Sequence, residues 1–221
     1  EQLKDDLWEE KLHASALHGD MEQYERDRTL IQFSNKSTSI LVATDVAARG
    51  LDINELDLVI NFELSADPEV HVHRVGRTGR AGRAGTAASL VMRSEENRLA
   101  AINNYRHTSH ETLSPDILPA WGNVKLYPPM VTLSIGGGKR DKLRPGDLLG
   151  ALTASKEIDG ISIGKINVLD KITYVALAQE SARRGPTYLV LSSRPSALAS
   201  RECHRIAEHR RKGGSRSSAV E

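Results

Sequence analysis

The feature that most constrains the fold is a set of short apolar runs that end at polar residues. Residues 39–43 form a continuous run that stops at Thr44, residues 56–60 repeat the pattern, and residues 86–91 are the last segment of this kind. Such runs are typical of strands that are buried on both faces of a parallel sheet. Helix-like segments alternate with them, which predicts an α/β fold: a doubly wound parallel sheet with helices on both faces.

The elements around these runs follow from local patterns. Apolar residues at helical spacing predict helices over residues 1–12, 21–33 and 94–105, and a short strand over residues 14–17. Asp20 is the predicted N-cap of the second helix, and Ser94 is the predicted N-cap of the third.

Ligands of doubly wound sheets bind in loops beyond the carboxyl ends of the strands, and residues 44–52 follow such an end. Further along, Arg77 and Arg80 are three residues apart, a spacing that aims both side chains the same way on a helical turn. Guanidinium groups match phosphate oxygens bidentately and stay charged. The pattern therefore predicts a site that reads a triphosphate.

Two segments carry a resemblance to a known family. Residues 43–53 (ATDVAARGLDI) and 73–83 (HRVGRTGRAGR) resemble motifs V and VI of the DEAD-box RNA helicases. Residues 23–26 (QYER) resemble the family's Q-x-x-R motif, and residues 17–21 (LHGDM) resemble its usual lead-in. The resemblance implies that residues 1–106 form the second, C-terminal RecA-like domain of an ATP-dependent RNA helicase, truncated on its N-terminal side.

The resemblance also implies a role for each matching residue. ATP would be bound by Gly50, Asp52, Arg77 and Arg80. The two arginines would be catalytic, as arginine fingers that stabilise charge on the transferred phosphoryl group. Coupling between the ATP and RNA sites would involve Asp45, His73 and Arg74. RNA-backbone contacts would come from Gln23, Arg26, Thr44 and Arg49.

Structural alternatives stand beside these roles. Arg77 and Arg80 also fit an arginine-rich surface turn, and Asp52 also fits a turn cap. Gln23 and Arg26 also fit a solvated helix face. An Asp45–Arg74 pair that only holds the two motifs together is as consistent with the residues as direct catalysis.

The phosphate-binding half of such an enzyme is not visible. Nothing in the chain matches a G-x-x-x-x-G-K-[ST] loop or an Asp-Glu-Ala-Asp box. ATP and Mg²⁺ are the implied cofactors, with metal ligands expected in a missing N-terminal RecA-like domain, so the isolated chain is predicted to be inactive as an ATPase. His71 and His73 lie beside Glu69 without a cysteine partner, and no metal site is expected there.

A second unit follows a segment rich in proline and glycine, residues 107–129, which is predicted to be a linker. A strand over residues 130–135, a helix from Pro145 to about residue 152, and strands over residues 161–169 and 172–177 predict an α+β domain of RRM type. Residues 135–152 and 163–166 resemble the C-terminal RNA-binding domain of a bacterial branch of the same family. That resemblance implies a hairpin of large-subunit ribosomal RNA as partner, recognised during ribosome assembly.

A flexible, basic, glycine-rich loop is expected after the first strand of this second unit and is the candidate RNA clamp, with an ordinary solvated loop as the alternative. Its cations are Lys139, Arg140, Lys142 and Arg144. The predicted strands carry few aromatic residues, so shape recognition of a hairpin is favoured over stacking of splayed bases.

The RRM-like domain is predicted to be partial, covering residues 130–178. Residues 179–221 show a strand-like segment (187–191) before a helix-like one (197–211), the reverse of the family order. Residues 181–221 hold nine Arg or Lys against three Asp or Glu. This composition suggests a basic tail unrelated to the family, for which a reading-frame change is one hypothesis.

Composition narrows the classes of protein to which the chain could belong. The net charge is +1, and a single cysteine, Cys203, excludes an intrachain disulfide and suits a reducing compartment. No run of 18 apolar residues occurs, and the acidic start lacks an apolar signal core. The expectation is a monomeric, cytoplasmic RNA helicase part. The alternatives are a non-catalytic RNA-binding fragment and an inactive truncated gene product.

Overall fold

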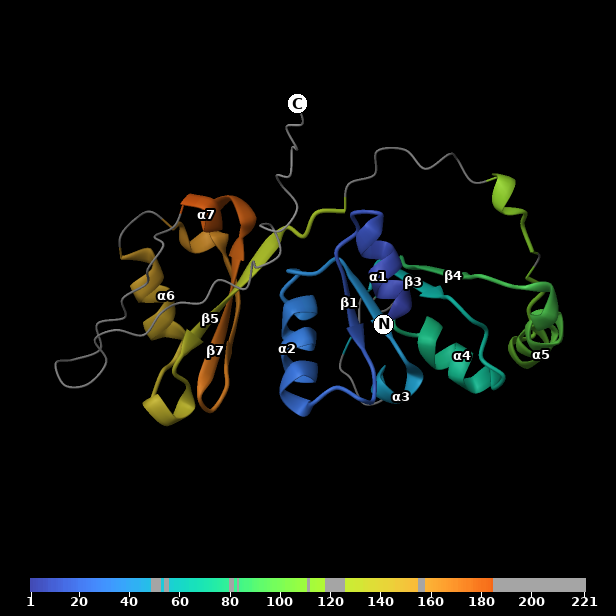
Figure 1. Ribbon diagram of the computed structural model, residues 1–221, viewed down its shortest axis with the longest axis horizontal. Coiled ribbons are helices and arrows are strands. Elements are labelled where there is room, and N and C mark those ends of the chain that lie inside the picture. The colour runs from blue at the N-terminus through green and yellow to red at the C-terminus, as the bar shows by residue number, and fades with distance from the viewer. Residues whose placement is uncertain are drawn as a thin grey trace, which may run out of the picture. The chain divides into compact units, whose positions relative to one another are not determined.

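The computed structural model describes residues 1–48, 53, 56–79, 82, 84–110, 112–117, 126–154 and 158–184 (Figure 1). The described residues form two compact units. One unit contains residues 1–44 together with the residues from 126 onward, and the other lies within residues 45–124. Each unit is built around its own strands.

The first unit begins with a parallel strand pair. Its elements are α1 (Gln2–Glu9), β1 (Ala14–Leu17), α2 (Gln23–Ser34) and β2 (Ile40–Ala43). β1 and β2 run parallel, in register from Ala14 opposite Ile40 to Leu17 opposite Ala43, and α2 is the crossover between them. Leu17 is almost fully buried. The predicted strands and their parallel pairing are therefore confirmed.

Two details of this part differ from the sequence-based expectation. α2 begins at Gln23 after an extended Glu22, so Asp20 is not its N-cap. β2 is only partly buried, and Ala43 is exposed, although its apolar run predicted burial on both faces. The physical reason is local to the sheet: within the described part of the chain, β2 pairs with β1 alone.

The second unit holds another parallel pair. Its strands are β3 (Leu58–Asn61) and β4 (Thr86–Ser89), and its helices are α3 (Asp45–Ala48), α4 (Pro68–Val75) and α5 (Glu96–Arg106), with 3₁₀ turns η1 (Arg93–Glu95) and η2 (Pro115–Ile117). β3 and β4 are parallel and connected through α4. Asp67 caps α4, because its carboxylate accepts a hydrogen bond from the Glu69 N–H at 2.9 Å.

Glu95 fastens the start of α5. Its carboxylate is buried and accepts hydrogen bonds from the backbone N–H groups of Leu64 and Met92, both at 3.2 Å. Arg98 donates to the same carboxylate at 3.1 Å and to the Leu64 carbonyl at 2.9 Å. The N-cap of α5 is Glu95 and not the predicted Ser94, because the 3₁₀ turn η1 precedes the α-helix.

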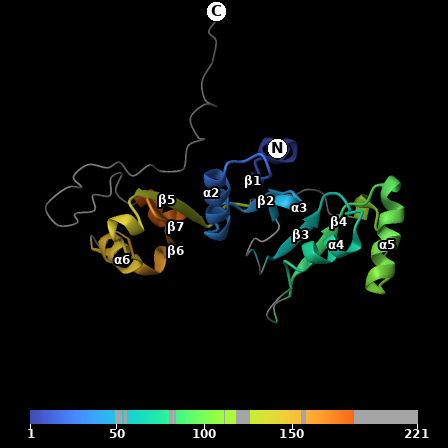
Figure 2. The same ribbon diagram turned by 90° about the horizontal axis from the view of Figure 1, so that it is seen from below.

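The remaining elements of the first unit form a three-stranded antiparallel sheet of order β5-β7-β6. They are β5 (Met130–Gly136), η3 (Lys139–Asp141), α6 (Pro145–Thr153), η4 (Gly160–Ser162), β6 (Ile163–Val168), β7 (Ile172–Ala178) and α7 (Gln179–Arg184). Figure 2 shows α6 beside this sheet. The order strand, helix, strand, strand is the one predicted for an RRM-like domain.

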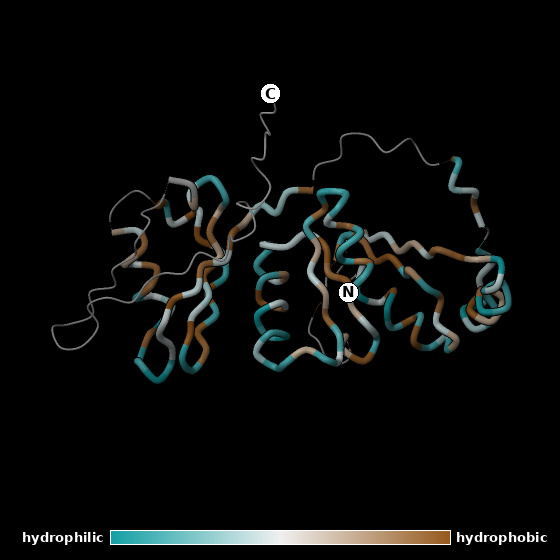
Figure 3. The backbone as a smooth tube through the Cα atoms, in the orientation of Figure 1, coloured by the Kyte–Doolittle hydropathy of each residue, from teal (hydrophilic) through white to brown (hydrophobic). Residues whose placement is uncertain are grey.

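The core of this sheet lies between the strands and α6. Val175 and Leu177 of β7 pack with Leu148 and Leu152 of α6 and are buried almost completely. The apolar residues of these elements, and those of the two parallel pairs, are brown in Figure 3. Ala182 of α7 packs against the same core, so a short helix stands where the sequence predicted the beginning of a tail. The predicted segments 187–191 and 197–211 lie outside the described residues.

Candidate functional site

The two motif segments of the second unit are joined by an ion pair. Arg74 of α4 donates from Nε to Oδ1 of Asp45 at 2.7 Å and from Nη2 to Oδ2 at 2.6 Å. Asp45 is the first residue of α3, directly after the segment that follows β2. The sequence-based expectation that these two residues pair is confirmed, and the geometry is bidentate.

Arg74 uses its third nitrogen as well. Nη1 donates to the Glu63 carbonyl at 2.8 Å and lies 3.5 Å from Oδ1 of Asn61. Asn61 is buried and donates to Ser89 Oγ at 3.0 Å, which connects this cluster to β4. The Asp45 carboxylate raises the pKa of Arg74, so the guanidinium stays charged. Sequence reasoning missed Asn61, although it ends an apolar run in the same way that Thr44 ends the run before it.

The backbone around Arg77 is held by the segment before β3. The Arg77 carbonyl accepts a hydrogen bond from the Leu56 N–H at 3.1 Å, and the Thr78 hydroxyl donates to the Leu56 carbonyl. Gly85 packs so closely that a Cβ there would collide with the Thr78 hydroxyl and the Gly79 N–H. Gly79 has φ +65°, a left-handed conformation that glycine adopts readily.

Several predicted residues cannot be placed next to Arg77. Arg49, Gly50, Asp52 and Arg80 lie outside the described residues. His73, on α4, is exposed, and Arg77 is partly buried. The structure therefore unites Asp45 with Arg74, and the predicted arginine-finger roles of Arg77 and Arg80 both stay predictions.

The predicted RNA-backbone residues of the first unit lie on α2 and after β2. Gln23 donates from Nε2 to Oδ1 of Asp27 at 2.7 Å on the exposed side of α2, and Arg26 is partly buried. Thr44 is exposed, and its N–H donates to the Leu17 carbonyl at 3.1 Å, which extends the β1–β2 pairing by one residue.

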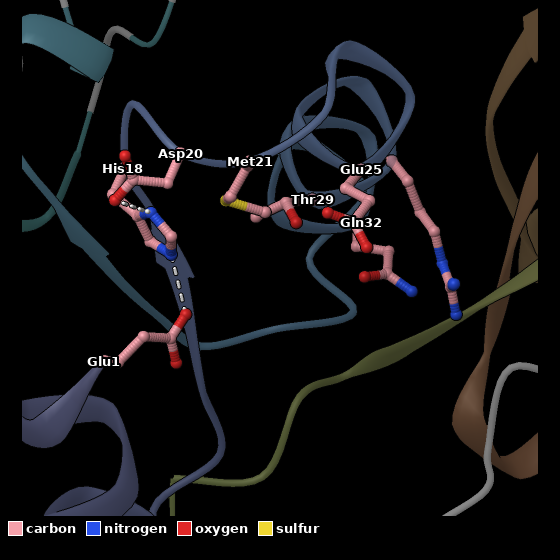
Figure 4. Close-up of a pocket in the computed structure, with 8 residues that line it drawn as sticks. Glu1, His18, Asp20, Met21, Glu25, Thr29 and Gln32 are labelled. Carbon is pink, nitrogen blue, oxygen red and sulfur yellow. Dashed lines mark hydrogen bonds and ion pairs between the residues drawn. The ribbon is translucent and has the colours of Figure 1, made fainter.

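A polar pocket of about 340 Å³ opens between α2 and the segment after β1 (Figure 4). His18 stands at its edge, 2.8 Å from Oε1 of Glu1 and 3.6 Å from Oδ2 of Asp20. The Lys4 ammonium, and after it His18, hold the pKa of Glu1 at about 2. None of the residues lining this pocket is a predicted site residue.

The basic loop of the antiparallel sheet is exposed at all four predicted cations. Lys139 and Arg140 lie in η3, Lys142 follows it with φ +59°, and Arg144 is the N-cap of α6. The expected flexible loop is thus partly a 3₁₀ turn. Arg140 is 3.9 Å from the carboxylate of Asp170 on the neighbouring hairpin.

The sheet face opposite α6 contacts α2 and the residues after it. Thr132 Oγ1 is 2.6 Å from Ser37 Oγ and accepts from Asn35 Nδ2 at 3.3 Å. The hydroxyl of buried Tyr174 donates to Tyr24 at 3.4 Å, and Lys165 donates to Ser34 at 2.7 Å. Burial, and then the Tyr24 hydrogen bond, raise the pKa of Tyr174.

His71 is a buried residue of α4, the helix that contacts α5, and its Nδ1 has no hydrogen-bond partner among the described residues. Burial lowers the pKa of His71, and Arg106, Arg74 and His110 lower it further. In the described ranges, no group of three or more His, Cys, Asp or Glu residues could hold a metal ion. No described helix has the length and apolar character needed to cross a membrane.

Two segments of the chain match known family models. Residues 1–82 match the helicase conserved C-terminal domain, and residues 132–185 match the DbpA RNA binding domain. The second match extends past residue 178, where the sequence predicted the domain to stop, and it includes α7.

Two curated relatives match most of this chain. The ATP-dependent RNA helicase DbpA of Escherichia coli (strain K12) is 50% identical over 172 residues, which are 77% of this chain and 37% of the relative. DbpA of Bacillus subtilis (strain 168) is 35% identical over 199 residues, 80% of this chain and 41% of the relative. A solved DEAD box protein from Methanococcus jannaschii is 41% identical, with a TM-score of 0.47 over 49% of this chain and 30% of that chain.

The two family matches, in this order along one chain, and the two relatives identify the C-terminal region of a DEAD-box helicase. Within that class the chain belongs to the DbpA type and corresponds to its C-terminal part. It spans about two fifths of the length of the curated relatives that it matches.

Proposed function

We propose that this chain is the C-terminal part of an ATP-dependent RNA helicase that remodels structured RNA. The substrate we propose is large-subunit ribosomal RNA during ribosome assembly, and the location we propose is the cytoplasm, with the chain as a monomer. The observation that carries the proposal is the order of the two matched domains along one chain that is 50% identical to Escherichia coli DbpA.

The proposed domains contain the two matched segments, residues 1–82 and 132–185. Residues 1–106 would be the C-terminal RecA-like domain, residues 107–129 the linker, residues 130–178 together with α7 the RRM-like domain, and the residues after α7 a basic tail. The Asp45–Arg74 bridge supports the first assignment, because it connects two motif segments that are 29 residues apart in sequence. The separate apolar core of β5–β7 and α6 supports the RRM-like domain.

Arg77 fits a role at a nucleotide phosphate. Its backbone is fixed by the Leu56 N–H and by the tight turn at Gly79, which limits the positions that its guanidinium can take. ATP would be held by Arg77 together with Gly50, Asp52 and Arg80, and when bound it would supply the phosphoryl group that is transferred to water. An arginine that neutralises charge on that group accelerates phosphoryl transfer by about 10³–10⁵. Ligands for Mg²⁺ are proposed to lie in an N-terminal RecA-like domain.

Asp45, His73 and Arg74 are proposed to couple the nucleotide site to RNA. Arg74 connects α3 to the ends of β3 and α4 through its bonds to Asp45 and the Glu63 carbonyl. A shift of either motif segment would therefore be transmitted to the other. Gln23, Arg26, Thr44 and Arg49 are the proposed contacts to the RNA backbone, which such residues bind without reading sequence.

The basic loop is the proposed hairpin-binding surface of the RRM-like domain. Ordinary RRMs stack bases on aromatic residues of the sheet face. Here Thr132 and Tyr174 on that face are buried and hydrogen-bonded to Ser37 and Tyr24. The remaining candidate for the RNA-binding surface is the group of exposed cations Lys139, Arg140, Lys142 and Arg144. These cations favour recognition of an RNA by its shape and through contacts to its phosphates.

A non-catalytic RNA-binding module is the second candidate function. Its support is that the antiparallel sheet has its own core and its own basic loop, neither of which depends on a nucleotide. RNA-stimulated ATP hydrolysis by the pure chain is not expected under either function, and its detection would contradict the proposed need for an N-terminal RecA-like domain.

The test of the proposed function is binding of the chain to a labelled large-subunit ribosomal hairpin and to a scrambled hairpin of equal length. Both titrations are run at two salt concentrations. A preference for the ribosomal hairpin that persists at the higher salt is the expected result. Equal and strongly salt-dependent binding to both RNAs would show that only charge acts, and would remove the ribosomal substrate from the proposal.

A further inference from the structure

The basic loop after β5 is attached to the hairpin between β6 and β7 by backbone hydrogen bonds. The Gly137 N–H donates to the Lys171 carbonyl at 3.0 Å, and the Lys139 N–H donates to the Leu169 carbonyl at 2.8 Å. The Arg140 N–H donates to the Asp170 carbonyl at 3.1 Å. The loop and the hairpin tip therefore form one connected surface, although about 30 residues separate them in sequence.

Gly138 makes this attachment possible. A Cβ at this position would collide with the carbonyl oxygen of Leu169 and with the backbone of Asp170. Only glycine lets two backbones approach so closely. The buried Thr173 hydroxyl of β7 donates to the carbonyl of the neighbouring Gly137 at 2.8 Å. This side-chain hydrogen bond adds to the backbone bonds between the loop and the β6–β7 hairpin.

The carboxylates within the loop are occupied by backbone groups. Asp141 accepts from the Gly138 N–H at 3.0 Å, and Asp147 accepts from the Arg144 N–H at 3.2 Å. Neither of them forms an ion pair with a loop cation within the described ranges. The one carboxylate near a loop cation is Asp170, whose contact to Arg140 is 3.9 Å with both side chains about two-thirds exposed.

Lys171 adds a further cation at the hairpin tip. Its side chain is exposed, and it forms no ion pair with any described residue. Its carbonyl is the acceptor for Gly137, so its Cα is fixed relative to the loop. The surface thus carries cations on two segments, and backbone bonds hold those segments at a constant separation.

We propose that Lys171 and the basic loop together form a two-segment clamp for the phosphates of a folded RNA, with Gly138 as its positioning residue. The proposal rests on the RNA-binding function proposed above. It adds to the RNA-binding surface the β6–β7 hairpin of the protein, which the sequence motifs do not include. Cations held at a constant separation fit the regular phosphate spacing of a double-helical stem better than a flexible single strand.

The test uses the full chain with Lys171→Gln, and Arg93→Gln as the matched control. Arg93 is an exposed cation in the other compact unit, so its loss removes the same charge without touching the clamp. Affinity is measured for a ribosomal hairpin and for an unstructured RNA of equal length, across a salt series. Lys171→Gln is expected to weaken hairpin binding by about 3–10-fold and to reduce the salt slope by about 0.7–0.9, as for one lost phosphate contact. The control should match the parent chain.

A third variant, with Lys139, Arg140 and Lys142 all changed to Gln, separates the two proposals. If this variant binds the hairpin as well as the parent chain does, the basic loop is not an RNA surface and the underlying function fails. If it binds weakly while Lys171→Gln binds normally, the loop is confirmed and the two-segment clamp is overturned. If Lys171→Gln weakened the affinity for the RNA hairpin and for the unstructured RNA equally, the clamp would also be overturned, because the lysine would then act only through its charge.

Gly138→Ala tests the positioning role. The added methyl group would push the basic loop away from the β6–β7 hairpin without removing a charge. The affinity for the RNA hairpin should therefore fall, while the salt slope of binding stays near that of the parent chain. An unchanged hairpin affinity in a folded Gly138→Ala chain would show that the attachment is not needed. Thermal melting establishes folding for each variant, and Lys171→Gln, which is on the surface, decides the proposal if Gly138→Ala does not fold.

Discussion

Asp45 and Arg74 are joined by two parallel hydrogen bonds of 2.7 and 2.6 Å across 29 residues of sequence. The side chains are 40% and 27% exposed, so solvent screens the charge attraction, and much of the value of the pair lies in its geometry. The planar guanidinium also reaches the Glu63 carbonyl, which a point charge on a flexible stem could not do at the same time.

Arg74→Lys should therefore destabilise the chain despite keeping the charge. We expect a loss of about 1–2 kcal/mol in the free energy of unfolding, because the bidentate contact and the bond to Glu63 are broken. Urea unfolding followed by circular dichroism measures this loss, with Arg93→Lys as the control. An unfolding midpoint equal to that of the parent chain would show that the fork geometry has no structural role.

Gly85 should not tolerate a side chain. In Gly85→Ala the new methyl group would collide with the Thr78 hydroxyl and the Gly79 N–H, so the turn that carries Arg77 must shift. The expected loss is about 1–3 kcal/mol, the usual range for overpacking. Gly150→Ala is the control, because nothing lies near its Cβ position in α6 and alanine favours the helix. Similar melting temperatures for the two variants would contradict this account.

His71 should make stability depend on pH. Burial lowers its pKa in the folded chain, so the unfolded chain binds more protons once the pH falls below the ordinary histidine value of about 6.5. The contribution of His71 is therefore fully present above that value and is lost as the pH falls toward the lowered pKa.

His71→Phe keeps an aromatic ring and removes the titration. Unfolding by urea at pH 8 and at pH 5.5 should show a smaller loss of stability for this variant than for the parent chain. Arg106, Arg74 and His110 are unchanged in it, so their own effects cancel in the comparison. Parallel pH profiles for the two chains would exclude His71 as the source.

Thr132 should stabilise the contact between the antiparallel sheet and the end of α2. Thr132→Val preserves shape but removes the partner of Ser37 and of the buried Asn35. We expect a loss of about 1–3 kcal/mol, since a buried amide is left without its acceptor. Tyr174→Phe removes a longer bond of 3.4 Å and should cost less. The two variants are compared by thermal melting, and the opposite ranking would argue against this contact.

Much of the local structure could be predicted from residue order. The strand over residues 14–17 and the helix starting at Pro145 have the predicted positions, because apolar spacing and proline placement act within a few residues. The predicted N-cap Asp20 was wrong by two residues and Ser94 by one, because the extended Glu22 and the last residue of a 3₁₀ turn, Glu95, hold the capping positions. Capping depends on small differences between adjacent residues of similar propensity.

The sequence by itself determined the strand patterns and the family motifs, and it offered the pairing of Asp45 with Arg74 as one of two interpretations. The strand patterns depend on residue types at short spacing. The two arms of the Asp45–Arg74 pair lie in segments that resemble motifs V and VI of a known family. Only the tertiary structure decided that β2 is partly exposed, that Asn61 joins the Arg74 cluster, and that Lys171 lies against the basic loop. Each of these depends on which distant backbone segments meet, and that is set by packing across the whole unit rather than by any local pattern.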